Sequence, residues 1–100
     1  MSIDAQIDEK IVTSLQPPRL WKVIFLNDDK TPMEFVIDLL TQIFKHDETT
    51  AKNLTLEIHQ TGSAVAGVYT HEIAETKVIE STTSARSHGF PLQITIEMEQ

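Results

Sequence analysis

The sequence predicts an α+β two-layer sandwich, in which a three-stranded antiparallel sheet is covered on one face by three helices in the order β-α-α-β-α-β. Short segments rich in β-branched and aromatic residues lie between longer segments whose apolar residues recur at helical spacing. The last segment, LQITIEME, alternates apolar and polar residues, as a strand with one solvent-facing side does. Packing the helices on one face of the sheet buries every apolar stripe.

The first predicted strand is Leu20 to Leu26, and the turn-forming residues 27–29 follow it directly. A helix is expected next, because Thr31 can cap it, Pro32 suits its first position and Glu34 stands three residues after the cap. The apolar residues of this helix fall on one stripe: Val36, Leu39, Leu40, Ile43 and Phe44.

The middle of the chain predicts two more helices separated by a strand. Asp47 can cap the second helix, and Gly62 stands where a left-handed residue would end it. Residues 63–69 predict the second strand, and Thr70 can cap a third helix that runs to about His88. The inward positions of the second helix are expected to be Ala51, Leu54, Thr55 and Ile58.

Residues 1–19 are predicted to be a flexible N-terminal arm, and residues 20–100 to be the folded domain. The arm ends in Pro17-Pro18, a pair that stops a helix. Its apolar residues recur every four positions, which allows a marginal helix, although one this short is rarely stable unless it packs. These residues are Ile3, Ile7, Ile11 and Leu15. The arm is therefore either a frayed terminus or a segment that becomes ordered on a partner.

The whole composition is acidic, with a formal net charge of -7 and a pI near 4.9. An anionic surface repels a phosphate backbone, which argues against nucleic-acid binding and favours a basic partner. The absence of cysteine excludes disulfides and thiolate zinc sites. The sequence opens without a signal-peptide pattern and contains no apolar run long enough to span a bilayer. We therefore expect a soluble, cytoplasmic protein with no membrane partner, and we also expect a monomer.

Polar side chains gather where the first strand ends. Asn27, Asp28 and Asp29 offer an amide oxygen and two carboxylates, and His59, at the edge of the second helix's apolar stripe, could add a ring nitrogen. Such acceptors suit the ammonium group of another polypeptide. The plainer alternatives are turn residues that bond to nearby backbone N–H groups, and a histidine that simply packs.

Catalytic interpretations have little support in the sequence. It contains no Gly-rich phosphate loop, nucleophile elbow or HExxH motif. A metal or acid–base centre made from Asp28, Asp29 and His59 would have no recognisable ligand spacing. We therefore expect no catalytic residue, cofactor or metal. A metal or acid–base enzyme is the rival hypothesis, and metal-dependent thermal stabilisation would support it.

Three segments resemble the ClpS adaptors of the Clp protease: WKVIFLNDDKTPMEFVIDLL, HQTGSAVAGVYTHEIAETK and ARSHGFPLQITIEME. The resemblance extends from about Trp21 to Glu99, and its long, specific motifs make chance similarity implausible. It implies a receptor for N-degrons, which are free N-terminal residues that are bulky and hydrophobic. It also implies that the receptor passes these substrates to the N-terminal domain of an AAA+ Clp unfoldase, ClpA-like or ClpC-like, without catalysis of its own.

The resemblance also implies roles for individual residues. The α-amino group of the substrate would be bound by Asn27, Asp28 and His59. Glu72 and Lys77 match residues that contact the unfoldase, and the arm is implied to serve handover rather than docking. The implied hydrophobic pocket consists of Asp29, Thr31, Met33, Val36, Thr55, Ile58 and Leu92.

Thr55 departs from the family pattern, because most members carry at this position a methionine that limits pocket shape and rejects β-branched first residues. Threonine is smaller, and its hydroxyl can bond back to the carbonyl of Ala51. We expect a wider pocket, with either tolerance of Ile and Val or a stronger preference for large aromatic first residues. The alternative is that neighbouring side chains repack and fill the space.

The same order of elements also resembles the C-terminal domain of the ribosomal stalk protein, a docking module without an amine pocket. That domain lacks the NDDKTPMEF run found here. A docking module of that kind is the alternative function.

Overall fold

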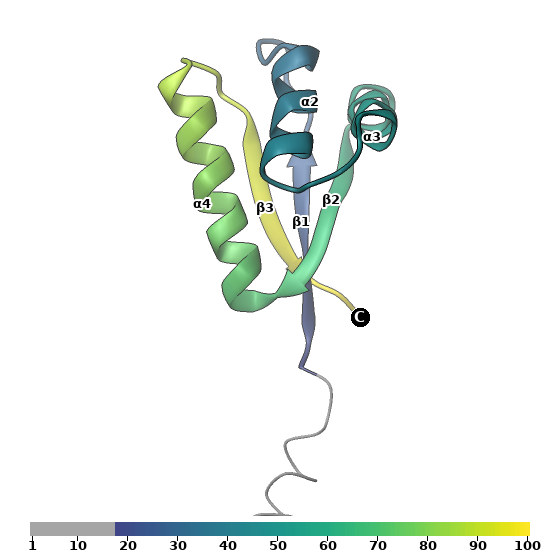
Figure 1. Ribbon diagram of the computed structural model, residues 1–100, viewed down its shortest axis with the longest axis vertical. Coiled ribbons are helices and arrows are strands. Elements are labelled where there is room, and N and C mark those ends of the chain that lie inside the picture. Colours follow the sequence, from purple (N-terminus) through teal and green to yellow (C-terminus); the bar gives the residue numbers. More distant parts are fainter. Residues whose placement is uncertain (1–17) are drawn as a thin grey trace, which may run out of the picture.

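Three antiparallel strands form the sheet of the computed structural model, which describes residues 18–100 (Figure 1). Strand β1 (Leu20–Leu26) lies in the middle, between β2 (Ser63–Thr70) and β3 (Gln93–Met98). Both neighbours pair with β1 in antiparallel register. The three helices are α2 (Met33–Gln42), α3 (Glu48–Thr61) and α4 (His71–Ser87). The predicted α+β sandwich and its element order are confirmed.

The core lies between the helices and one face of the sheet. Val23 and Phe25 on β1 have no exposed surface, because alternate residues of a strand point to the same face. On β3, Ile94 is buried, whereas Thr95 and Glu97 are exposed on the other face. The alternation predicted for this strand is therefore confirmed. Most of the other large buried side chains come from the helices, and Phe44 and Leu92 are buried just after α2 and just before β3. The helical ones are Val36, Leu39, Leu40 and Ile58.

Helix α2 begins two residues after Thr31, so the prediction that Thr31 caps this helix is wrong. Pro32 occupies the N-cap position with an extended backbone, and no side chain caps the helix. The physical reason is a competing partner, because the hydroxyl of Thr31 donates to Oδ2 of Asp28 at 2.7 Å. The end of the helix is set by Lys45, whose φ of 62° reverses the chain two residues after the C-cap Ile43.

The boundaries of the other two helices agree with the sequence signals. Asp47 is the N-cap residue of α3, and Gly62 ends that helix with a left-handed φ of 98°. This φ suits glycine, which has no Cβ to clash with the following carbonyl. Thr70 is the N-cap residue of α4, and His88 is its C-cap. Both helices therefore begin and end within about one residue of the predicted positions.

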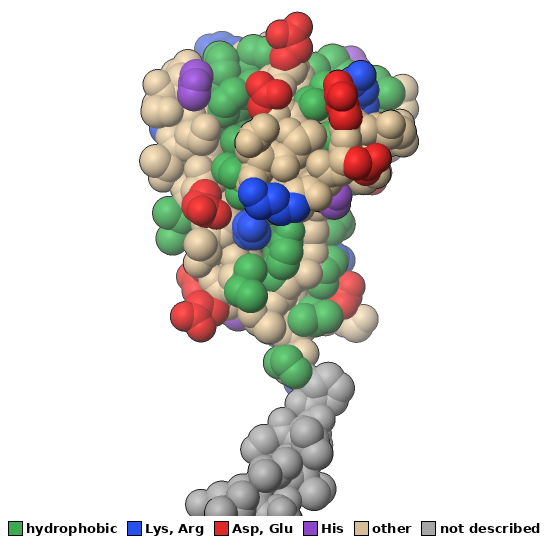
Figure 2. Space-filling view, viewed as in Figure 1, with side chains coloured by type: hydrophobic (Ala, Val, Ile, Leu, Met, Phe, Trp, Pro, Cys, Tyr) green, Lys and Arg blue, Asp and Glu red, His purple; other side chains and the backbone are tan. Residues whose placement is uncertain are grey.

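The predicted arm falls almost entirely outside the described residues, which begin at Pro18. Arg19 is the first described residue with a side-chain contact, a hydrogen bond from Nη1 to Sδ of Met98. Within residues 18–100, the longest helix is too short and too polar to cross a lipid bilayer. Figure 2 shows acidic side chains spread over the face that the helices form, in keeping with the net charge of -7.

Ser81 is the one buried side chain of α4 whose polar atom lacks a hydrogen-bond partner within the described part of the chain. Its exposed fraction is 0%. An unpaired buried hydroxyl costs stability, so Ser81→Ala is expected to raise the free energy of unfolding by about 1 kcal/mol more than Ser84→Ala does. Ser84 lies on the same helix and is partly exposed, so both variants gain the same helix propensity. Urea denaturation measures the difference, and equal effects of the two substitutions would show that the hydroxyl carries no burial cost.

Candidate functional site

A cavity of about 360 Å³ lies between the turn after β1, the start of α2 and one side of α3. Every residue predicted to hold an amine or to form the hydrophobic pocket lines it, except Leu92, and Pro32 joins them. The lining residues are Asn27, Asp28, Asp29, Thr31, Pro32, Met33, Val36, Thr55, Ile58 and His59. Residues more than thirty positions apart in the sequence thus share one concave surface.

The turn after β1 is organised by the side chain of Asp28. Its Oδ1 accepts hydrogen bonds from the backbone N–H groups of Lys30 and Thr31, both at 2.8 Å. Its Oδ2 accepts the Thr31 hydroxyl. The turn-residue alternative is therefore correct for these bonds. A carboxylate has about four lone-pair positions, so Oδ2 can still accept a donor from a guest.

The negative charge of Asp28 is stabilised in place. Partial burial raises the pKa of this carboxyl, but the hydrogen bonds from Thr31 and Lys30 outweigh it, with a smaller contribution from the positive charge of Arg86. The net result is a pKa below the ordinary value. Asp28 is consequently anionic at neutral pH and presents a fixed negative charge at the rim of the cavity.

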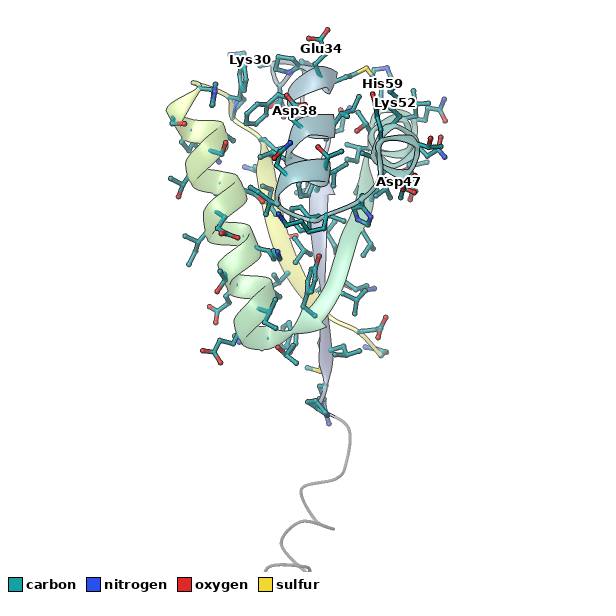
Figure 3. The ribbon with its side chains drawn as sticks, viewed as in Figure 1. Lys30, Glu34, Asp38, Asp47, Lys52 and His59 are labelled. Carbon is teal, nitrogen blue, oxygen red and sulfur yellow. The ribbon has the colours of Figure 1, made fainter. Side chains whose placement is uncertain are left out.

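The other polar groups of the rim come from two different elements. Asn27 and Asp29 are exposed on the turn, and the backbone N–H of Asn27 donates to the carbonyl of Gly62 at 2.9 Å. This bond ties the end of β1 to the end of α3. His59 is exposed on α3, and Figure 3 shows it at the end of the molecule where Lys30 and Glu34 flank the start of α2. The rim therefore combines oxygen acceptors with an imidazole.

The inner wall of the cavity is apolar. Val36 and Ile58 are buried, whereas the side chain of Met33 is 41% exposed. Thr55 is 3% exposed, and its hydroxyl donates to the carbonyl of Ala51 at 2.7 Å. The back-bond predicted for Thr55 is confirmed. Because its own helix uses the hydroxyl hydrogen, Thr55 acts toward the cavity mainly as a small wall residue.

Leu92, which the sequence analysis placed in the pocket, is not among the residues that line this cavity. Leu92 is 1% exposed and packs within the core instead. Its carbonyl and that of Phe90 both accept hydrogen bonds from Nη1 of Arg86, each at 2.8 Å. Arg86 thus fixes the loop before β3 and also influences the charge of Asp28. Sequence reasoning missed this residue, since a basic residue in the last turn of a helix is common and does not reveal its acceptors.

Glu72 and Lys77, predicted to contact the unfoldase, differ in their surroundings. Glu72 is exposed in the first turn of α4. Lys77 is half-buried, and its Nζ donates to the carbonyl of Ile43 at 2.7 Å and lies 5.8 Å from the centre of the Tyr69 ring. Lys77 therefore caps the end of α2 besides carrying a charge.

A metal centre has no geometric support in the described range. Among residues 18–100, no group of three histidine, aspartate or glutamate side chains is arranged to hold a metal ion. Asp28, Asp29 and His59 share the cavity without forming such a group.

Comparison with known proteins identifies the family. The family model described as ATP-dependent Clp protease adaptor protein ClpS matches residues 16–95. The chain belongs to the ClpS adaptor family. Its family members are adaptors of the Clp protease rather than enzymes. Family membership sets aside the ribosomal-stalk alternative.

The similarity to individual ClpS proteins spans nearly the whole chain. The ClpS adapter protein of Leptothrix cholodnii is 49% identical over 94 residues, which cover 94% of this chain and 82% of that protein. The ClpS adapter protein of Burkholderia mallei is 46% identical over 94 residues, with 94% and 90% covered. The structure of Agrobacterium tumefaciens ClpS2 bound to L-phenylalaninamide matches with a TM-score of 0.80 and 44% identity, covering 83% of this chain and 100% of that one.

The hydroxyl of Thr31 is expected to control the ionisation of Asp28 in this ClpS fold. Thr31→Val removes one donor to the carboxylate and should raise its pKa, whereas Thr31→Ser keeps the donor and should leave it low. Because the folded pKa is lowered, the stability from Asp28 is fully present above its unfolded pKa of about 3.9 and is lost as the pH falls through the folded pKa.

The carboxyl ¹³C chemical shift of Asp28, followed by NMR against pH, measures this pKa directly. Urea denaturation at neutral and at acidic pH should show that acidification lowers the free energy of unfolding less for Thr31→Val than for Thr31→Ser. Identical titration curves for the two variants would contradict the assignment.

Proposed function

We propose that this adaptor recognises polypeptides by a free N-terminal amino group together with a bulky hydrophobic first side chain, and delivers them to an AAA+ Clp unfoldase. The observation that carries the proposal is a single cavity whose rim is polar and anionic and whose wall is apolar. Neither half alone distinguishes an N-terminus from other parts of a protein. The two halves together do.

The polar half matches an ammonium group. A peptide α-amino group has a pKa near about 8, so at neutral pH it is mostly cationic and offers three N–H donors. The acceptors would be Asn27, Asp28 and His59. The lowered pKa of Asp28 keeps its carboxylate negatively charged, opposite to the charge of the ammonium group. Each hydrogen bond to a charged group contributes about 1.5–3 kcal/mol before the cost of ordering the partners.

The apolar half matches a large side chain. Val36, Thr55 and Ile58 would surround it, with Met33 at the more exposed side. Burying a Leu or Phe side chain contributes about 1.5–3 kcal/mol, comparable with one of the charged bonds. After the loss of translational and rotational freedom, a dissociation constant on the order of micromolar is expected.

The ligand reported for Agrobacterium tumefaciens ClpS2 supports this division of roles. L-phenylalaninamide has one free α-amino group, one aromatic side chain and a neutral amide in place of a carboxylate. It therefore has the chemistry of a phenylalanine at the first position of a chain. This chain is 44% identical to that protein and shares its fold with a TM-score of 0.80.

The delivery step would use different surfaces. We assign contact with the N-terminal domain of the unfoldase to Glu72 and Lys77 on α4, which do not line the cavity. Residues 1–19 would act as an arm in handover. We further propose that the adaptor works as a cytoplasmic monomer, since the cavity is built from one chain and the sequence has no cysteine.

Blocking the substrate amine tests the ammonium half of the site. Acetylating the N-terminus of a Leu-initiated or Phe-initiated peptide removes the charge and two donors, so binding should be lost or weakened by at least about a hundredfold. Fluorescence anisotropy with C-terminally labelled peptides measures the change. The matched control is a peptide with a free amine and an initial Gly, which should also bind weakly because it leaves the apolar wall uncovered. Retention of acetylated Leu or Phe peptides within a few-fold would sink the proposal.

We also propose that Thr55 alters the choice of first residue. Its buried position and its bond to Ala51 leave a short side chain at a wall where most family members have methionine. The extra space would admit a branch at Cβ, as in Ile and Val, or a larger ring, as in Trp and Tyr. Volume alone does not choose between these outcomes.

The substitution Thr55→Met should narrow the range of accepted first residues. Peptides that begin with Ile, Val, Trp or Tyr are expected to weaken relative to a Leu peptide by about fivefold or more, because an added methionine fills the space they need. Thr55→Val is the matched control, since it keeps the volume and removes only the hydroxyl. Anisotropy over a series of first residues gives the ranking. Identical rankings for the wild type and Thr55→Met would remove any role of Thr55 in specificity.

A further inference from the structure

The sheet has two edges, and the chain itself protects one of them. The register between β1 and β2 shifts between Val23 and Ile24, so Ala66 has no partner across the ladder. Such a bulge disrupts pairing along an edge strand. The carbonyl of Ala66 accepts a hydrogen bond from Nε2–H of His46. The β2 edge thus has a bulge and a backbone carbonyl that is already hydrogen-bonded. Both features oppose the addition of another strand.

Within residues 18–100, the opposite edge, formed by β3, has neither feature. Its register with β1 is continuous from Gln93 to Met98. Glu99 donates its backbone N–H to the carbonyl of Leu20 at 2.9 Å. This bond shows that the odd-numbered residues of β3 direct their backbone groups toward β1. By alternation, the backbone groups of every second residue of β3 point away from β1. These outward residues are Ile94, Ile96 and Met98.

A mostly apolar groove of about 300 Å³ runs along this same edge, between β3 and α4. Figure 1 shows α4 beside β3, whereas α3 lies on the side of β2. Ile79 of α4 lines the groove, and its exposed fraction of 64% is the highest among the exposed large apolar residues of residues 18–100. The lining consists of Glu75, Val78, Ile79, Ile94, Thr95 and Ile96. Strand backbone without a partner among the described strands and accessible apolar surface therefore coincide.

Among the described residues that line the groove, the only charged one is acidic, which favours a basic occupant. Glu75 lines it with a side chain that is 57% exposed and lies 3.1 Å from the ring of His71. The chain as a whole carries -7. Its own N-terminal segment is a poor match, because residues 1–17 contain Asp4, Asp8 and Glu9 against one lysine, Lys10. Like charges would oppose docking of that segment here.

We propose that the open edge of β3 and the α4–β3 groove form a second binding site, which takes an extended basic segment of a partner protein by strand addition. The incoming strand pairs its backbone with Ile94 and Ile96. Its inward side chains pack on Val78 and Ile79, and a flanking lysine or arginine meets Glu75. No residue lines both this groove and the cavity after β1, so both can be filled at once.

The probe is a hexapeptide of sequence Lys-Val-Thr-Val-Lys-Val with fluorescein coupled to its N-terminal amine and an amidated C-terminus, so that both lysine side chains stay charged. It cannot use the cavity after β1 as a free amine, so this test is independent of the proposed N-degron function. Its partner control replaces both lysines by glutamates. The basic peptide should bind the full chain, and the acidic one should bind at least about tenfold more weakly.

Hydrogen exchange of the full chain, measured by NMR, locates the bound peptide. In the free protein the amide of Thr95, which faces β1, should exchange more slowly than that of Ile96, which faces outward. Addition of the basic peptide should slow exchange at Ile96 and leave Thr95 unchanged. Protection of Ile96 in the free protein equal to that of Thr95 would mean that the chain's own arm or a second copy covers the edge, and would overturn the proposal.

Two matched pairs of variants test the groove side chains. Ile79→Lys should weaken the basic peptide by about fivefold or more, whereas Ile73→Lys, at a 48% exposed residue of the same helix outside the groove, should have little effect. Glu75→Lys should likewise weaken binding more than Glu80→Lys, which makes the same change in net charge at an exposed residue outside the groove.

Three further results would also overturn the proposal. The first is equal weakening by each member of a pair, which would show only general charge attraction. The second is equal binding of the acidic and basic peptides. The third is an NMR response confined to residues around the cavity after β1.

Discussion

The carboxylate of Asp28 is the interaction on which the site depends. It accepts two backbone N–H groups and one hydroxyl within a single turn, and so determines how the chain passes from the central strand into α2. The same bonds draw Thr31 away from the helix, which therefore begins at Met33. One side chain thereby sets the backbone path, the start of a helix and the charge at the rim. Loss of this carboxylate would change all three together.

Periodicity was sufficient to predict the strands, the helices and their order, because each apolar stripe needs a partner and only one packing satisfies them all. Local signals also located the helix ends at Asp47, Gly62 and Thr70, where a short segment decides the geometry. Thr31 was assigned wrongly because two acceptable partners compete for its hydroxyl, and a sequence gives no distances. The same limit applies to Leu92, which packs in the core and is not among the residues that line the cavity.

The residues of the candidate site were gathered from the sequence chiefly through the family resemblance. Composition and spacing alone indicated acceptors after β1 and suggested that His59 could join them, but they left a simply packed histidine as the alternative. The contacts made by Arg86 and Lys77 show what sequence patterns leave out. Each is a long basic side chain that reaches backbone carbonyls of a different segment, and a solvated helix face would have the same appearance in the sequence.

The bond between the N–H of Asn27 and the carbonyl of Gly62 has a consequence for the kinetics of capture. Together with the turn around Asp28, it makes the rim a product of folding, so that a guest meets donors and acceptors already oriented. Little conformational entropy then remains to be lost when the complex forms. The association rate constant should consequently be limited mainly by diffusion and by the orientation of the two partners. Differences in affinity between substrates should then appear mainly in their dissociation rate constants.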